Sequence, residues 1–383
     1  MREIRVILIS SVLPESTTGG QVTLHRHLIE RPGICLDQFK RQTENDGCKS
    51  VFWKVVQRIK STRFSRYAED LMVLENGCWI DAISPQKSIQ AGRTVVLTVA
   101  HAGDCQAALR FAQKNNLPLV TFFHDWWPDI PNVHSPFRRR LASQFLELYQ
   151  KSSAALCVCE GMKSALGENP RATVLFPIPK NAPLLPQITK TKAGSKRFRV
   201  YYFGNLFEYG PMLAMALKEA GKNEKLLFEV RGANPNWPED FHDAMRNEGR
   251  WKEFARRSEL DSWLAEADAF LIPMVFDPQF RRRMETSFPS KLIEFAQFGK
   301  PLVIWGPEYC SAVRWASHGD RGLCVTDPSP CVLVEAIENL AESPPQLRHY
   351  AMAAAESARD EFNSDRIHAQ FLAELEKALS HSS

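Results

Sequence analysis

The sequence predicts an α/β protein with two domains, and three observations support this fold class. The chain has 383 residues, more than one typical domain contains. Short apolar runs rich in β-branched residues alternate with segments of helical periodicity in both halves, which is typical of parallel sheets covered by helices. A polar stretch without periodicity, residues 186–197, lies between the halves and is typical of a linker.

The expected elements fall into two similar sets. The N-terminal half contains five strand patterns, at residues 4–10, 95–100, 119–123, 154–159 and 172–176, with helical segments at 104–116 and 137–150. The C-terminal half contains five more, each with a helix after it, at 198–204, 226–232, 269–274, 301–306 and 322–326, and closes with two helices between 347 and 380.

These elements predict the domain boundaries. We expect an N-terminal domain over residues 1–185, a C-terminal domain over 198–360, and a final helix, 361–383, that packs back on the N-terminal domain. Ligands of open parallel sheets bind outside the carboxyl ends of the strands. We therefore expect the two domains to face a central cleft.

Composition excludes several classes of protein. No run of 18 uncharged apolar residues is present, and the first ten residues are too short and too charged for a signal peptide. The nine cysteines are scattered without a CxxC pair, which favours reduced thiols in a cytoplasmic protein over disulfides or a zinc site. A pI near 8.5 and the lack of a recognisable module disfavour nucleic-acid binding.

Basic residues gather in the N-terminal half. Residues 1–190 hold 24 Lys and Arg against 16 Asp and Glu, although the whole chain carries only +4. Arginines lie beside Phe, Leu and Tyr at helical spacing in residues 54–67 and 135–151. Such stretches are suited to an anionic membrane surface or an acidic substrate, and they are also compatible with ordinary solvated helices.

Two stretches of the N-terminal half contain candidate catalytic or ligand-binding residues. Gly19 and Gly20 stand between the first strand and a helix, where the backbone can approach a ligand closely, although a plain tight turn has the same pattern. His124 and Asp125 follow the strand 119–123, where an imidazole or carboxylate can accept a proton from an attacking hydroxyl. The indole of Trp126 offers a flat face for a sugar ring, and His101 closes the preceding strand.

The C-terminal half offers a second turn of the same kind. Gly204 and Gly210 flank the first strand-to-helix turn there and leave room for a phosphate. Arg231 ends the next strand, where a fixed cation can face a diphosphate or simply lie at the surface.

A charged cluster at the start of an apolar helix, SFPSKLIEFAQFGKPLV at residues 287–303, carries a resemblance. Residues 289–305 resemble the nucleotide-sugar-binding segment of GT-B glycosyltransferases, particularly glycosyltransferase family 4: Phe288 matches the loop aromatic, Glu294 the second glutamate, and residues 299–301 the turn into a strand. Gly19-Gly20, His124-Asp125, residues 158–166 and residues 259–273 follow in the order of that family.

The resemblance implies two Rossmann-like domains and a nucleotide-sugar donor, with UDP as the expected nucleotide. Glu294 would accept the ribose hydroxyls, Ser287, Phe288 and Ser290 would form the donor loop, and Lys291 would add a charge near the diphosphate. No metal cofactor is implied, because helix amides and cations would stabilise the leaving group. Asp125 or Glu160 would act as general base if the reaction inverts, and His124 would position the sugar if it retains.

Several positions depart from the family pattern. Thr286 replaces the first glutamate, and Asn205 and Tyr209 stand where the family has Arg and Lys. Arg231, Lys291 and residues 281–283 are then the candidates for neutralising the diphosphate. The SKL loop resembles that of glucuronosyltransferases of bacterial polysaccharide assembly.

The expected function is transfer of a sugar to a hydroxyl of a glycan or lipid-linked glycan bound by the basic N-terminal domain, in the cytoplasm or peripherally at the inner face of the membrane. Two alternatives stay open. One is a sugar-nucleotide epimerase of the same fold, which would need no acceptor. The other is a GT-B module that binds a glycan or a partner without catalysis.

Overall fold

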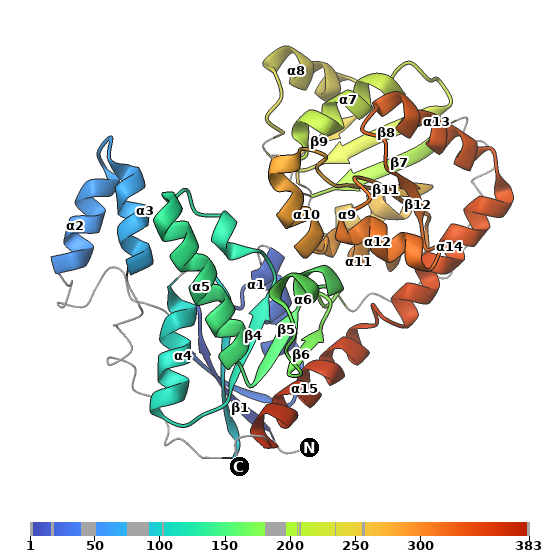
Figure 1. The fold of residues 1–383 in the computed structure, drawn as a ribbon. Helices are drawn as coiled ribbons and strands as arrows, with labels where there is room; N and C mark the ends of the chain where they lie inside the picture. The colour runs from blue at the N-terminus through green and yellow to red at the C-terminus, as the bar shows by residue number, and fades with distance from the viewer. Residues whose placement is uncertain are drawn as a thin grey trace. The chain divides into compact units, whose positions relative to one another are not determined.

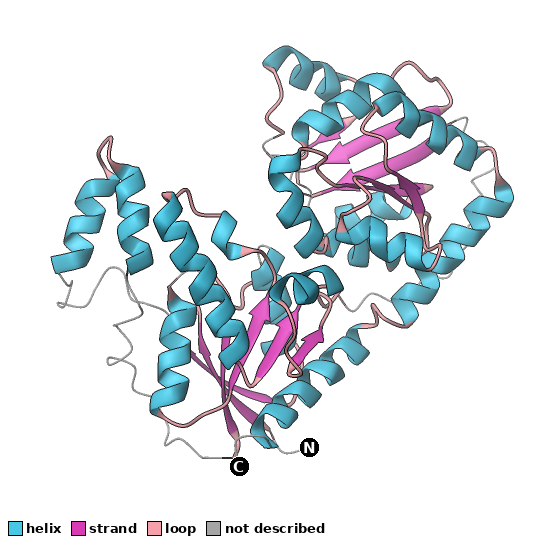
Figure 2. Ribbon diagram, viewed as in Figure 1, coloured by secondary structure: helices cyan, strands magenta, loops and turns pink. Residues whose placement is uncertain are grey.

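The computed structural model describes residues 3–16, 19–39, 51–74, 92–101, 103–180, 197–204, 206, 208–233, 235–254 and 257–380. The chain forms two compact units. Unit 1 comprises Met1–Pro177 together with Ile367–Ser383, and unit 2 comprises Ile178–Arg366. Helices surround a parallel sheet in each unit, as Figure 2 shows. Most of the expected linker, residues 186–196, lies outside the described residues.

Unit 1 is built on a six-stranded parallel sheet. The strand order is β2-β1-β3-β4-β5-β6 (Figure 1). The strands are β1 (Ile4–Ile9), β2 (Ile34–Phe39), β3 (Thr94–Val99), β4 (Leu119–Phe123), β5 (Ala154–Cys157) and β6 (Ala172–Val174). All residues of β3, β4 and β5 are buried, because helices cover both faces of the sheet and demand continuous apolar strands. The strand order reverses between β1 and β3, which makes that edge the expected ligand site of the sheet.

Seven helices and a short 3₁₀ turn belong to unit 1 in the described part of the chain. They are α1 (Gly19–Leu28), α2 (Val51–Lys60), α3 (Ser65–Leu74), α4 (Asp104–Lys114), η2 (Trp127–Asp129), α5 (Ser135–Lys151), α6 (Glu160–Leu166) and α15 (Ser364–Ser380). The last helix joins unit 1 from Ile367 onward. Gln370 of α15 donates to the Val174 carbonyl at 2.9 Å, and His368 Nε2 lies 3.2 Å from the Pro32 carbonyl.

Unit 2 repeats the architecture with another six parallel strands. Their order is β12-β11-β10-β7-β8-β9. The strands are β7 (Phe198–Phe203), β8 (Leu226–Arg231), β9 (Trp251–Lys252), β10 (Ala269–Pro273), β11 (Leu302–Trp305) and β12 (Leu323–Val325). The order reverses between β7 and β10, so the loops after these strands are the expected ligand site of unit 2.

The helices of unit 2 pack on both faces of its sheet. They are α7 (Gly210–Ala220), α8 (Glu239–Asn247), α9 (Arg257–Ala265), α10 (Arg281–Thr286), α11 (Ser290–Ala296), α12 (Ser311–His318), α13 (Pro330–Ala341) and α14 (Pro344–Arg359), with the 3₁₀ turn η3 (Pro278–Phe280) before α10. Leu213, Leu217, Val230 and Leu271 belong to the buried core that α7 and α13 share with the sheet.

The fold class expected from the sequence is confirmed, and all ten expected strands are present within a few residues of their predicted bounds. The sequence patterns missed β2 and β9. Within the described residues, no helix is long and apolar enough to cross a membrane.

Candidate functional site

A pocket of about 300 Å³ opens in unit 1 where the strand order reverses. It lies at the carboxyl ends of β1, β3 and β4 and at the start of α1. Its lining residues are Ser11, Val12, Gly20, Gln21, Val99, Ala100, His101, His124 and Asp125. The structure thus brings together four residues that the sequence singled out separately, and adds Ser11 and Gln21, which carried no signal in the sequence.

His101 is held in a fixed orientation at the pocket wall. Its Nδ1 lies 3.2 Å from the Ser11 hydroxyl, and its ring centroid lies 3.9 Å from that of Trp127. Burial lowers the pKa of His101, and the nearby Asp125 carboxylate opposes this effect. The imidazole is therefore mainly neutral near pH 7, so it can accept or donate a hydrogen bond to a sugar hydroxyl.

His124 is held even more tightly. Its ring stacks on Phe122 with centroids 5.1 Å apart and an interplanar angle of 8°. Burial lowers its pKa, with Asp125 again opposing, and its Nε2 is buried without a hydrogen-bond partner among the described residues. His124 is thus suited to orienting a ligand, whereas the carboxylate of Asp125 is the general-base candidate in the pocket.

Three acceptor-side candidates lie away from the pocket lining. Trp126 packs edge-on against Phe145 of α5, with ring centroids 5.3 Å apart. The indole beside His101 belongs to the next residue, Trp127. Gly19 is exposed, and a Cβ there would meet open space. Glu160 is exposed in the first turn of α6. None of the three lines the pocket.

In unit 2, the turn after β7 packs against the start of α11. The Lys291 ammonium lies 4.4 Å from the centroid of the Phe203 ring, a cation–π contact. A Cβ added to Gly204 would lie 2.8 Å from the Tyr202 hydroxyl and 3.7 Å from Lys291 Cγ. A glycine at this position therefore leaves room for the Tyr202 hydroxyl, and Lys291 of α11 lies within ordinary contact distance of the carboxyl end of β7.

An aromatic pocket continues this edge of the sheet. Phe254 meets the Phe203 ring edge-on at 5.5 Å. Phe254 also lines a pocket of about 430 Å³ after β8 and β9, together with Ala233, Pro235, His242, Trp251 and Glu253. Phe203 thus contacts both the Lys291 ammonium and Phe254, a lining residue of this pocket, so the phenylalanine pair links the cation to the pocket.

The expected donor loop is fixed by buried contacts. Phe288 is buried and meets the rings of Trp315 and Phe362, each at 6.1 Å. The Ser287 carbonyl accepts a hydrogen bond from the Ser311 hydroxyl. These two loop residues act as anchors in the structure. The side chains of Ser290, Lys291 and Glu294 are half-buried and share one face of α11, because residues three and four apart are neighbours on a helix.

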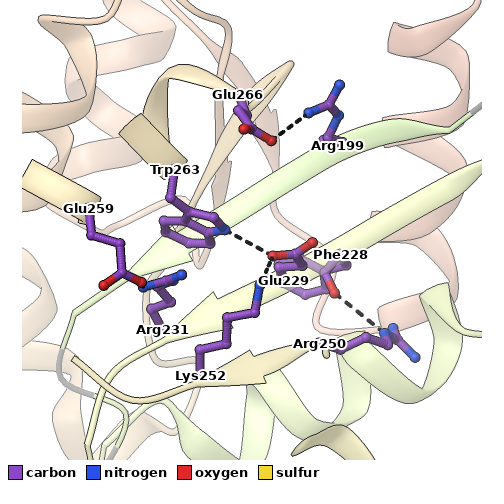
Figure 3. Close-up of polar contacts among 9 residues, drawn as sticks. All are labelled: Arg199, Phe228, Glu229, Arg231, Arg250, Lys252, Glu259, Trp263 and Glu266. Carbon is purple, nitrogen blue, oxygen red and sulfur yellow. Dashed lines mark hydrogen bonds and ion pairs between the residues drawn. The ribbon is translucent and has the colours of Figure 1, made fainter. Parts of the chain in front are cut away.

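Arg231 ends β8 as expected, but its side chain is buried under α9, as Figure 3 shows. Its guanidinium forms an ion pair with Glu259 at 3.0 Å and lies 5.0 Å from the centre of the Trp263 ring. Trp263 in turn donates to Glu229 at 2.9 Å (Figure 3). This layer occupies Arg231 on the face of the sheet that α9 covers.

The arginine run on α10 is also paired. Arg283 binds Glu208 at 2.6 Å and so ties α10 to the turn after β7. Arg281 binds Glu285 at 2.9 Å and stacks over the Tyr309 ring. Asn205, the remaining donor-side candidate, lies outside the described residues. Among the described residues, no group of three or more His, Cys, Asp and Glu side chains is arranged to hold a metal ion.

Comparison with known proteins places this geometry in a known fold. No protein-family profile matches the sequence, and a search of curated proteins finds no significant match. Solved structures do match over nearly their full length. Anabaena HepE in complex with UDP is 15% identical, with a TM-score of 0.62 over 98% of this chain and 99% of that chain. HepE in complex with UDP-glucose is 14% identical, with a TM-score of 0.62 over 97% and 99%.

A third solved structure points the same way. Sucrose-phosphate synthase from Thermosynechococcus elongatus is 14% identical, with a TM-score of 0.64 over the whole of both chains. Identities this low support the fold and no more. The chain therefore has the GT-B fold, with the two parallel α/β units that the resemblance of its donor segment predicted.

Proposed function

We propose that the protein is a glycosyltransferase that moves a sugar from a uridine-diphosphate donor to an acceptor hydroxyl. The observation that carries the proposal is the arrangement at the carboxyl edge of the unit 2 sheet, where Lys291 and the aromatic pocket meet at Phe203 and Phe254. A nucleoside diphosphate needs a cation for its phosphates and an aromatic surface for its base. The UDP and UDP-glucose that HepE binds within the same fold add support.

Each part of the donor has a matching feature in unit 2. The pocket of about 430 Å³ is large enough for a base, with the exposed ring of Phe254 as a stacking surface. The diphosphate would lie between Lys291 and the Gly204 turn, which admits close backbone approach. Glu294, one turn after Ser290 on α11, would accept the ribose hydroxyls.

The acceptor hydroxyl would be activated in the unit 1 pocket. Asp125 is the proposed general base, and the neutral imidazoles of His101 and His124 would orient the sugar through hydrogen bonds. Lys291 would stabilise the departing diphosphate, so we propose that the reaction needs no bound metal. Activity in the presence of EDTA tests that point, and its loss would contradict it.

The acceptor is proposed to be a glycan or lipid-linked glycan of bacterial polysaccharide assembly, reached from the cytoplasm at the inner face of a membrane. Support comes from the surplus of 24 basic over 16 acidic residues in positions 1–190. A lipid-linked acceptor sits among anionic headgroups, and a basic N-terminal unit is attracted to them.

The test is release of UDP from UDP-glucose and UDP-glucuronate, with and without lipid-linked glycans extracted from bacterial membranes. We expect acceptor-dependent UDP release and a labelled lipid product with one of the donors. Conversion of the nucleotide sugar without an acceptor would identify an epimerase. A protein that binds no nucleotide at all would instead be a non-catalytic module.

A further inference from the structure

In unit 1 the α2–α3 hairpin lies beside α5 (Figure 1), and aromatic and basic side chains at its tip and at the start of α5 form an exposed surface. We name it the hairpin-tip surface and define it by Arg63, Phe64, Tyr67, Arg138 and Arg139. Phe64 is 48% exposed and Tyr67 is 54% exposed, and all three arginines are exposed. None of these residues belongs to either pocket described above.

The hairpin is fixed to α5 by specific contacts. The backbone N–H of His134, the residue before α5, donates to Asp70 of α3 at 2.9 Å. The His134 ring stacks on Tyr67 with centroids 5.3 Å apart, and Tyr67 lies 6.1 Å from Phe64. Below this stack, Val73 packs with Leu141 of α5 in a small buried cluster. These contacts therefore fix the position of the two exposed rings on unit 1.

Three cations belong to this surface. The Arg63 guanidinium lies 4.9 Å from the centroid of the Phe64 ring. Arg138 and Arg139 follow His134 within about one turn of helix, and the backbone N–H of Arg138 donates to the His134 carbonyl. Within the described residues, no ion pair neutralises Arg63, Arg138 or Arg139. Of the two acidic residues of α3, Glu69 and Asp70, the second is occupied by His134.

We propose that the hairpin-tip surface docks on the anionic face of a lipid bilayer. Phe64 and Tyr67 would enter the boundary between headgroups and acyl chains, and Arg63, Arg138 and Arg139 would bind lipid phosphates. Exposed aromatic side chains with arginines nearby suit a bilayer surface, because the aromatic rings bury apolar area while the guanidinium groups stay at the level of the headgroups. The inference rests on the proposed function to the extent that a lipid-linked acceptor gives docking its purpose.

The test is flotation of the full chain with vesicles of phosphatidylcholine alone and of equal parts phosphatidylcholine and phosphatidylglycerol. We expect binding to the anionic vesicles only, weakened by added salt. A cation near the surface contributes about a fivefold gain in affinity. The Arg138→Glu/Arg139→Glu variant should therefore lose at least about twentyfold, and Phe64→Ser/Tyr67→Ser about tenfold.

Helix α14 supplies matched controls, because Met352 is 53% exposed and Arg348 and Arg359 are exposed. The Arg348→Glu/Arg359→Glu and Met352→Ser variants should float like the wild type. Failure of the wild type to bind anionic vesicles would overturn the proposal. So would equal losses in the test and control variants, or binding of an RNA duplex through the same residues in place of vesicles.

A UDP titration of each variant separates this inference from the proposed function. If the wild type binds UDP but does not bind the vesicles, membrane docking is refuted and the transferase proposal is not. If the wild type does not bind UDP, the proposed transferase function is refuted, whether or not the protein binds vesicles. Thermal unfolding of the variants confirms that each is folded.

Discussion

Replacing Lys291 with Gln removes the cation that the structure places beside the turn after β7. The ammonium lies 4.4 Å from the Phe203 ring centroid, and a phosphate above the Gly204 turn would lie at a similar distance. Two unit charges about 5 Å apart at an effective dielectric near 20 interact by about 3 kcal/mol. Loss of hydration at the half-buried ammonium offsets part of this, leaving roughly 1.5–2 kcal/mol.

That free energy corresponds to a tenfold to thirtyfold increase in the Kd for UDP, measured by calorimetry. Lys218→Gln on α7 is the matched control, because Lys218 also lies over a phenylalanine ring, at 4.9 Å from the centroid of Phe241. Both variants should lose about 0.5–1 kcal/mol of cation–π stability. Only Lys291→Gln should weaken UDP binding, and equal UDP affinity in the two variants would refute the placement of the diphosphate.

Three further variants probe other parts of the fold and site. Asp125→Asn should lower the rate of sugar transfer by about a hundredfold or more with UDP affinity unchanged, and undiminished turnover would remove it as general base. Gly210→Ala should lower the free energy of unfolding by about 2–4 kcal/mol, because the new Cβ would lie 1.9 Å from the Pro235 carbonyl oxygen, whereas Gly19→Ala should be nearly neutral in chemical denaturation. Burial and the neighbouring His368 hold the pKa of His27 well below 6.5 in the folded state. The unfolded chain thus binds the proton first, and stability should fall as pH drops below about 6.5, by up to about 1.4 kcal/mol per unit; an unchanged acid slope in His27→Leu would contradict this origin.

The strands were predictable where burial demands a continuous apolar run. All residues of β3 and β4 are buried, and both stood out in the sequence. Strand β2 did not, because Asp37 interrupts its apolar pattern; in the structure this carboxylate forms an ion pair with Arg5 of β1 at 2.6 Å. Strand β9 has two residues, too few for any periodicity.

The candidate site was predictable where a residue type is tied to a turn. Gly204 and Lys291 both came from sequence patterns, and the structure packs them together. Phe254 gave no signal, because its role depends on contact with Phe203 at the end of β7, 51 residues earlier in the chain. The end of β8 was also predicted correctly, but not the face to which Arg231 points, because adjacent residues of a strand point to opposite faces.

The most direct test of the donor site is hydrogen–deuterium exchange of the full chain with and without UDP. The account predicts slower exchange at residues 203–204 and 208–210, at 251–254, and at 290–294, with little change at Ser11 or His101 in unit 1. Protection confined to unit 1, or no protection at saturating UDP, would contradict the assignment of unit 2 as the nucleotide-binding unit.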